Sequence, residues 1–166
     1  MKTKTNSNEA IAKAHSLPVS TKMSVEICSA IRGKPLNKAI AHMEAVVEFK
    51  RPVEVKRFNW DLGHKPGYGP ARYPISAAKA FISLLKLVKA NAENKGLNSD
   101  RLVVNFAKAD FGPQRWHFGR QRRTRMKDTH IEIHVKEAEV KAAKKVQSKT
   151  KENKSQWLKG KSLHRN

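Results

Sequence analysis

Two short segments in which apolar and polar residues alternate lie on either side of an arginine-rich run, and this order restricts the fold more than any other feature. In the first segment, the side chains predicted to share one face of a strand are Leu102, Val104 and Phe106. In the second, one face carries Ile131, Ile133 and Val135, and the other carries His130, Glu132 and His134. Because consecutive strands connect most simply as antiparallel neighbours, residues 101–135 are predicted to form one long hairpin.

The predicted hairpin is too long to stay within a small domain. Its 35 residues leave about 17 for each arm, and that number spans about 55 Å in extended conformation. A domain of about 100 residues has a radius of gyration near 13 Å. The far end of the hairpin is therefore expected to project from the domain and to be buried in a partner.

The far end of this hairpin is strongly basic. From Gly112 to Lys127 the chain has five arginines, one lysine and no acidic residue. Arginine binds phosphate through a planar fork, and aromatic rings stack on unpaired bases. The pattern predicts a finger that binds structured RNA, and the alternative is a solvated run of charge. The predicted hairpin tip consists of Gln114, Arg115, Trp116, His117 and Phe118.

The composition of the whole chain agrees with a polyanionic partner. There are 35 Lys and Arg residues against 14 Asp and Glu, a net charge of +21 that repels itself in the folded state. No apolar run approaches the roughly 18 residues of a membrane span, and no secretion signal is recognised, so a soluble intracellular protein without a membrane partner is expected. The single cysteine, Cys28, excludes a disulfide framework and a multi-cysteine zinc site. No cofactor or metal is predicted.

Three helices are predicted before the hairpin. The first follows Ser20, a predicted N-cap, and ends at Gly33; the second starts at Pro35; the third follows Ser76 and ends before Gly96. Their apolar stripes are predicted to form the core: Val25, Cys28 and Ile31; Leu36, Ala39, Ile40, Met43 and Val47; Ala78, Phe81, Ile82, Leu85, Val88 and Ala92. Cys28 is interpreted as a small buried apolar residue rather than a reactive thiol.

The remaining segments are expected to be loops or tails. Residues 50–74 contain four prolines and three glycines among basic and aromatic residues, which excludes a helix and predicts an irregular, packed loop. Residues 1–8 are polar and expected to be flexible. After Val135 the chain holds ten Lys and Arg and three Glu, so residues 138–166 are predicted to be a basic extension that orders only on a polyanion. One domain, residues 9–137, lies between the two tails.

Two alternatives come from other functional classes. The motif HIEIH places His130, Glu132 and His134 on one strand face, as a metal-dependent nuclease would need, but the sequence supplies no clear further ligand. A small protein that compacts DNA would share the charge but would not need an aromatic finger.

Several of these segments, in order from Glu9 to Glu137, resemble universal large-subunit ribosomal protein twenty-two. They are AIRGKPLNKAI, KANAENKGL, the GP that opens the finger, the FGR in its middle and the closing THIEIHVKE. KRFN at residues 56–59, GPARYPISAAKAF and the lysine-rich extension are similar to the archaeal and eukaryotic branch. The extension favours a eukaryotic cytosolic ribosome.

The resemblance implies an α+β domain of three helices on a small antiparallel sheet, with a protruding hairpin and a first strand around residues 9–17. It also implies binding to large-subunit rRNA, a role in subunit assembly, and a hairpin that lines the polypeptide exit tunnel near the nascent chain. Neighbouring ribosomal proteins are implied partners, and no homo-oligomer is expected. The implied location is the cytoplasmic ribosome, with a transient nucleolar stage in a eukaryote.

The resemblance also assigns RNA contacts residue by residue. In the finger these are Arg115, Arg120, Arg122, Arg123, Arg125 and Lys127. In the rest of the domain they are Lys22, Arg32, Lys34, Lys50, Arg51, Lys56, Arg57, Lys65 and Arg72. Trp116, His117 and Phe118 are implied to lie at the tip or on the tunnel wall.

The chain departs from the family pattern in the length of the finger. Only QRWHF lies between Pro113 and Gly119, where the family has several more residues, while the distance from Gly119 to His130 matches the family. The loop from Asn59 to Arg72 also looks shortened. The finger is therefore expected to end earlier than in longer relatives.

Overall fold

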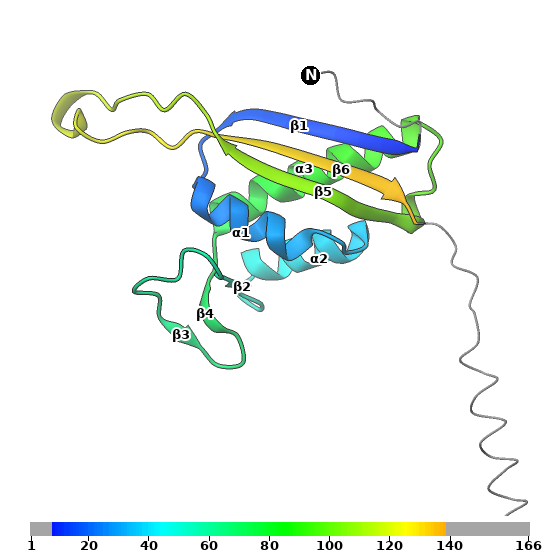
Figure 1. Cartoon of the computed structure of the whole chain (residues 1–166), viewed down its shortest axis with the longest axis horizontal. Helices are drawn as coiled ribbons and strands as arrows, with labels where there is room; N and C mark the ends of the chain where they lie inside the picture. Colours follow the sequence, from blue (N-terminus) through cyan, green and yellow to red (C-terminus); the bar gives the residue numbers. More distant parts are fainter. Residues whose placement is uncertain (1–7, 139–166) are drawn as a thin grey trace, which may run out of the picture.

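The main sheet contains three antiparallel strands in the order β1-β6-β5 (Figure 1). They are β1 (Glu9–Leu17), β5 (Leu102–Phe111) and β6 (Thr129–Glu137). The computed structural model describes residues 8–138, so the predicted basic extension beyond Ala138 lies outside the described residues, as does the start of the chain before Asn8. The strand that the resemblance implied at residues 9–17 is confirmed, and β5 and β6 pair as the two arms of the predicted hairpin.

Helices cover one face of this sheet. Within residues 8–138 they are α1 (Thr21–Ile31), α2 (Leu36–Val47) and α3 (Ile75–Asn94), with a short 3-10 helix, η1 (Ser99–Arg101), before β5. α3 packs against β1 and β6, and α1 packs against β5. This arrangement confirms the α+β fold of three helices on a small antiparallel sheet.

The core lies between the helices and the covered face of the sheet. Phe81 and Leu85 of α3 are fully buried, as are Ile131 and Ile133 of β6. Each such side chain contributes about 1.5–3 kcal/mol by leaving water. Cys28 is buried, which confirms its interpretation as a small core residue, and this burial raises the pKa of its thiol to about 12. Among the described helices, none has the length and apolar character needed to span a membrane.

The helix ends agree with the glycine signals. Gly33 and Gly96 follow α1 and α3 with φ of +76° and +74°, a conformation that glycine adopts without steric cost. After α3, the Leu97 amide donates to the Ala92 carbonyl (3.0 Å) and the Gly96 amide donates to the Glu93 carbonyl (2.9 Å). These two bonds form a Schellman C-cap.

The N-terminal ends of the helices and the set of buried helix residues agree less well with the prediction. Ser20 precedes α1, but its side chain makes no capping hydrogen bond, and Ser76 lies inside α3 rather than before it. Four predicted core residues are only half-buried: Val25, Ile40, Val47 and Ile82. Neighbouring residues that the stripes omitted are buried instead, namely Ile27, Val46, Ala77 and Leu84.

An irregularity in β5 changes which of its side chains face the core. Val104 and Phe106 pair with consecutive residues of β6, so Asn105 is left out of the ladder. Such a β-bulge shifts the alternation by one residue. Ala107 is therefore buried and Phe106 is 37% exposed. The prediction that Phe106 shares a face with Leu102 and Val104 is wrong for this reason.

Residues 50–74 form a second small sheet instead of a wholly irregular loop. Its strands, in the order β2-β4-β3, are β2 (Val53–Glu54), β3 (His64–Lys65) and β4 (Gly69–Arg72). Val53, Val55 and Ala71 are buried, so the segment is packed, as predicted. It lies at the α1–α2 side of the domain, below the sheet in Figure 1.

Candidate nucleic-acid interface

The connection between β5 and β6, residues 112–128, projects beyond the end of the main sheet (Figure 1). We call it the finger. Its two arms continue the antiparallel pairing through backbone hydrogen bonds from the amides of Gly112, Met126 and His117 to the carbonyls of Asp128 (3.0 Å), Arg115 (2.7 Å) and Thr124 (3.0 Å), respectively. The finger therefore extends the β5–β6 hairpin without forming regular strands.

The turn of the finger lies at residues 118–123, later in the chain than predicted. It contains the 3-10 helix η2 (Gly119–Gln121), and Gly119 has a φ of +63°. Because glycine supplies this positive φ, the chain reverses after Phe118 rather than before it. The predicted tip residues that instead lie in the outgoing arm are Gln114, Arg115 and Trp116. His117 and Phe118 border the turn.

Six cations of the finger are exposed to solvent. They are Arg115, Arg120, Arg122, Arg123, Arg125 and Lys127. Across residues 8–138, no ion pair joins any of them to an acidic side chain. Asp110, just before the finger, is already paired with Lys108 at 2.6 Å, and Asp128 at the end of the finger forms no ion pair within residues 8–138. The finger therefore presents uncompensated positive charge.

Exposed aromatic rings accompany this charge. Phe111, Trp116 and Phe118 are 70%, 57% and 86% exposed. The Arg125 guanidinium lies 4.7 Å from the centre of the Trp116 ring, a cation–π arrangement that holds both side chains in the paired arms. Flat exposed rings next to arginines suit stacking on unpaired bases.

A buried carboxylate positions the second basic region, residues 50–72, which we call the basic loop. Glu26 of α1 is 2% exposed. Its Oε1 accepts hydrogen bonds from the amides of Arg57 (2.8 Å) and Phe58 (3.3 Å), and its Oε2 accepts one from the amide of Lys56 (3.1 Å). These bonds fix the backbone of residues 56–58, and the side chains of Lys56 and Arg57 are exposed.

The basic loop adjoins the base of the finger through α1. Lys22 of α1 lies 5.8 Å from the Phe58 ring of the loop. Lys22 also shares a hollow of about 150 Å³ with Lys127 of the finger. The other predicted cations of the loop are exposed: Lys50, which pairs with Glu48 at 2.6 Å; Lys65, which lies 6.0 Å from the Tyr73 ring; and Arg72.

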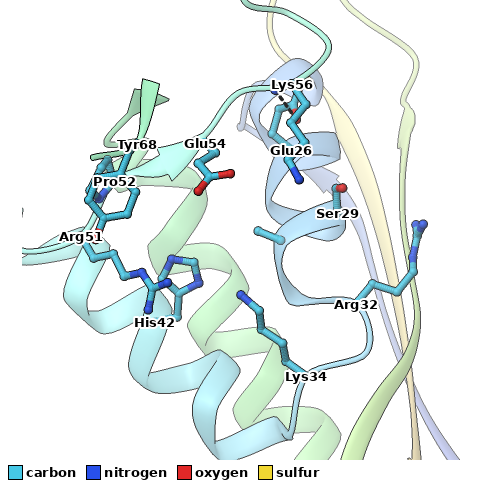
Figure 2. A pocket seen from close by; sticks show the side chains of 11 residues that line it. Glu26, Ser29, Arg32, Lys34, His42, Arg51, Pro52, Glu54, Lys56 and Tyr68 are labelled. Atoms are coloured by element: carbon cyan, nitrogen blue, oxygen red, sulfur yellow. Dashed lines mark hydrogen bonds between the residues drawn. The ribbon is translucent and has the colours of Figure 1, made fainter. Parts of the chain in front are cut away.

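The remaining predicted cations meet at a pocket of about 220 Å³ between α1, α2 and the second sheet (Figure 2). We call it the basic pocket. Four predicted RNA contacts line it: Arg32, Lys34, Arg51 and Lys56. The other lining residues are Glu26, Ser29, Ala30, His42, Pro52, Glu54 and Tyr68. Figure 2 shows Lys34, His42 and Glu54 pointing into the pocket, whereas Arg32 points away along β5.

The contacts of Arg32 give it a structural role. Its Nη2 donates a hydrogen bond of 2.7 Å to the carbonyl of Ala107, just beyond the bulge of β5. Because this bond ties the end of α1 to β5, Arg32 is less free for a ligand than Lys34 or Arg51. The structure therefore separates Arg32 from the other cations of the basic pocket.

Burial, together with neighbouring positive charge, lowers the pKa of two groups in the basic pocket. Partial burial, followed by the charge of Arg51, lowers the pKa of Lys34, against an opposing effect of Glu54. Burial first, and then Lys34 and Arg51, lowers the pKa of His42, against smaller raising effects of the Pro52 backbone and Glu54. Both groups therefore favour their neutral forms more than they do in water.

The sequence did not identify Glu26, His42, Glu54 or Tyr68 as site residues. They come from α1, α2 and the basic loop, three segments that only the folded chain brings together. The one available signal was the position of His42 in α2, three residues after the buried Ala39 and four before the buried Val46. This spacing places a polar ring beside the apolar stripe.

The polar side chains of β6 are engaged within the protein. Glu132 pairs with Lys13 (2.7 Å) and with the His134 Nε2 atom (3.0 Å), and these two contacts lower its pKa. The His130 Nδ1 atom accepts a hydrogen bond of 3.0 Å from the Ser16 amide. In the described part of the chain, no group of three or more His, Cys, Asp or Glu residues is arranged to hold a metal ion. These contacts argue against the nuclease alternative.

The fold and the two basic regions define a small, highly basic α+β protein with an arginine-rich finger. The chain belongs to the family "Ribosomal protein L22p/L17e", whose model matches residues 12–136. The family that the sequence resembled is therefore confirmed. Membership of a ribosomal protein family also confirms the expectation that the chain is not an enzyme.

Relatives from archaea include three proteins named "Large ribosomal subunit protein uL22". The chain is 42% identical to that of Thermoplasma acidophilum over 105 residues, which cover 63% of this chain and 70% of the relative. It is 41% identical to that of Staphylothermus marinus over 143 residues and 41% identical to that of Methanoculleus marisnigri over 138 residues; each match covers 78% of this chain and 90% of the relative.

Proposed function

We propose that this chain is a structural component of the large ribosomal subunit that binds the rRNA of that subunit and supports its assembly. The observation that carries the proposal is the finger, whose six exposed cations have no acidic partner in residues 8–138. A net charge of +21 disfavours the compact state unless a polyanion compensates it. The family supports rRNA as that polyanion.

The chemistry of the finger favours RNA with unpaired bases over duplex DNA. Arginine outnumbers lysine five to one between Gly112 and Lys127. The guanidinium group of arginine both binds phosphate through two hydrogen bonds and stacks on bases. Trp116 and Phe118 offer exposed rings next to these arginines. The finger and the basic loop both act as RNA contacts in this proposal, and Lys22 connects the two regions.

The proposal extends to the polypeptide exit tunnel. The finger runs along the tunnel wall, near the nascent polypeptide, and neighbouring ribosomal proteins contact the rest of the monomeric domain. Because the outgoing arm is short between Pro113 and Gly119, the turn stops about 5–10 Å earlier than in longer relatives, at 3.3 Å per residue of each arm. This chain therefore narrows the tunnel less, and its aromatic residues pack against RNA.

The location follows from the family. A ribosomal protein is found with the ribosome in the cytoplasm, and this chain is assigned there. A passage through the nucleolus applies only to a eukaryotic source and stays a prediction. Catalytic residues and cofactors have no part in the proposed function.

The test is co-sedimentation of the tagged chain with large ribosomal subunits. Substitution of Arg120, Arg122 and Arg123 by Gln removes three charges from the turn, while substitution of Lys79, Lys86 and Lys89 by Gln removes the same charge from α3. The finger variant is expected to leave the subunit fraction at moderate salt, whereas the α3 variant stays. A wild-type chain that never enters the subunit fraction would refute the proposal.

Two further experiments test the alternative functions. If the chain compacts DNA, duplex DNA and structured RNA compete equally well for the purified protein. If it is a nuclease, RNA incubated with divalent metal is cleaved, and the cleavage is lost in the variant His130→Ala. The proposal predicts preferential binding of structured RNA and no cleavage.

A further inference from the structure

The basic pocket contains a polar ring that the protein itself does not satisfy. Both nitrogens of the His42 imidazole are buried, and within residues 8–138 neither makes a hydrogen bond of 3.5 Å or less, although the Pro52 backbone lies close enough to act on the pKa of the ring. Buried polar atoms are usually bonded, and an unbonded one costs about as much as a lost hydrogen bond. A neutral imidazole offers one donor and one acceptor. A ligand that fills the pocket can therefore gain two hydrogen bonds from His42.

The pocket combines positive donors with a negative acceptor. Lys34 and Arg51 bring donors from two sides, and the carboxylate of Glu54 points into the same space (Figure 2). Glu54 makes no salt bridge in residues 8–138, while the other acidic lining residue, Glu26, is occupied by backbone amides. A phosphate alone would be attracted by the cations and repelled by Glu54.

A nucleobase fits this mixed pattern better than a phosphate does. The edge of a base presents N–H donors and ring acceptors side by side. Guanine carries two neighbouring N–H donors on its Watson–Crick edge, which suit a carboxylate, and two acceptors, O6 and N7, which suit lysine or arginine. The pocket holds several times the ~30 Å³ that one water molecule takes up, which leaves room for a single base.

We propose that the basic pocket binds the base of an unpaired guanine nucleotide in RNA, with Glu54 accepting from its Watson–Crick edge and Lys34 and Arg51 donating to its acceptors. The His42 ring forms hydrogen bonds with the base, Tyr68 provides a ring against it, and Lys56 at the pocket contacts the adjoining phosphate. This inference rests on the proposed rRNA binding and names a sequence-reading contact within it. The finger supplies charge, whereas the pocket selects a base.

The test uses the full chain with the four free ribonucleoside monophosphates and inorganic phosphate as probes. Binding at the pocket is followed by NMR through the chemical shifts of the His42 ring. GMP is expected to shift these signals at a lower concentration than AMP, CMP or UMP, and inorganic phosphate to shift them least. Equal effects of all five probes would overturn the proposal, and so would the absence of any shift.

The variant Glu54→Gln separates a base site from a phosphate site by the sign of its effect. Glu54 is exposed, so the variant is expected to fold. If the pocket reads guanine, the variant loses about tenfold or more in GMP affinity, as for a bidentate base contact. If the pocket only attracts phosphate, the variant binds every probe more tightly, and the proposal is wrong.

A finger variant distinguishes this inference from the proposed function. Replacement of Arg120, Arg122 and Arg123 by Gln is expected to weaken binding of structured RNA without changing the preference of the pocket for GMP. If the wild-type chain binds structured RNA but the pocket shows no base preference, only the inference fails. If the wild-type chain binds no structured RNA, the proposed function fails as well.

Discussion

The finger and the basic loop carry the same sign of charge but are held in different ways. Backbone hydrogen bonds between its two arms support the finger, and its cations are exposed. The basic loop has four buried residues, Pro52, Val53, Val55 and Ala71, and the buried carboxylate of Glu26 holds three of its amides. The loop is therefore anchored to the domain core, and the finger is not.

This difference separates two ways of binding a polyanion. The cations of the basic loop are placed before binding, so little conformational entropy is lost there when RNA arrives. The finger has hydrogen-bonded arms but no buried core of its own, so we expect a partner to order it further. Its contribution to affinity therefore comes from counterion release, whereas the loop with its pocket contributes geometry and selection.

The largest expected effect is the salt dependence of RNA binding. If at least about six cations neutralise phosphates, the slope of log affinity against log salt is about −4 or steeper. Replacing Arg120, Arg122 and Arg123 by Gln is expected to flatten the slope by about 2 to 3, at 0.7–0.9 per contact. Binding titrations at several salt concentrations measure both slopes, and a wild-type slope near −1 would contradict the account.

A smaller effect is expected in limited proteolysis of the free protein. Trypsin is expected to cut the finger between Arg120 and Arg125 at least about tenfold faster than it cuts at Lys56 or Arg57, because local opening of the anchored loop costs more. The basic extension beyond Lys136 is also predicted to be cut. Mass spectrometry of early fragments ranks the sites. Equal rates at the finger and the loop would remove the distinction drawn between them.

The variant Glu26→Gln tests what anchors the loop. It weakens three hydrogen bonds to a charged acceptor and is expected to lower the free energy of unfolding by about 2 kcal/mol. Tryptic cleavage at Lys56 and Arg57 should rise at the same time. Glu48→Gln is the matched control, since Glu48 forms an exposed ion pair with Lys50 and its loss is expected to leave stability nearly unchanged. Denaturant titrations compare the two.

The smallest effect concerns the base of the finger. A Cβ added at Gly112 would overlap Oδ1 of Asp128, so Gly112→Ala is expected to cost about 1 kcal/mol of stability while the carboxylate moves aside. The cost should disappear in the double variant with Asp128→Ala. An unchanged cost in the double variant would show that another contact limits the residue at this position.

The sequence predicted the elements better than the contacts between them. Helical stripes and strand alternation depend on nearby residues, so the helices and the β5–β6 pairing were predictable. The bulge at Asn105 was not, because it depends on how β5 fits over α1 and β6. Nor was the second sheet, since its strands are only two to four residues long.

The candidate site also has one part that the sequence predicted and one part that it did not. Arginines and aromatic rings of the finger are contiguous in the sequence, so their clustering was predictable, although the turn at Gly119 was placed too early. The basic pocket joins Lys34, His42, Glu54 and Tyr68 from separate segments. Only the packing of α1, α2 and the second sheet makes them neighbours.

A density map of the large ribosomal subunit that contains this chain tests the central claim most directly. The account predicts that residues 112–128 and the basic loop are both enclosed by rRNA, with the finger cations next to phosphates and the turn short of the narrowest part of the tunnel. A map in which the finger lies in solvent, or in which these cations face protein instead of RNA, would contradict it.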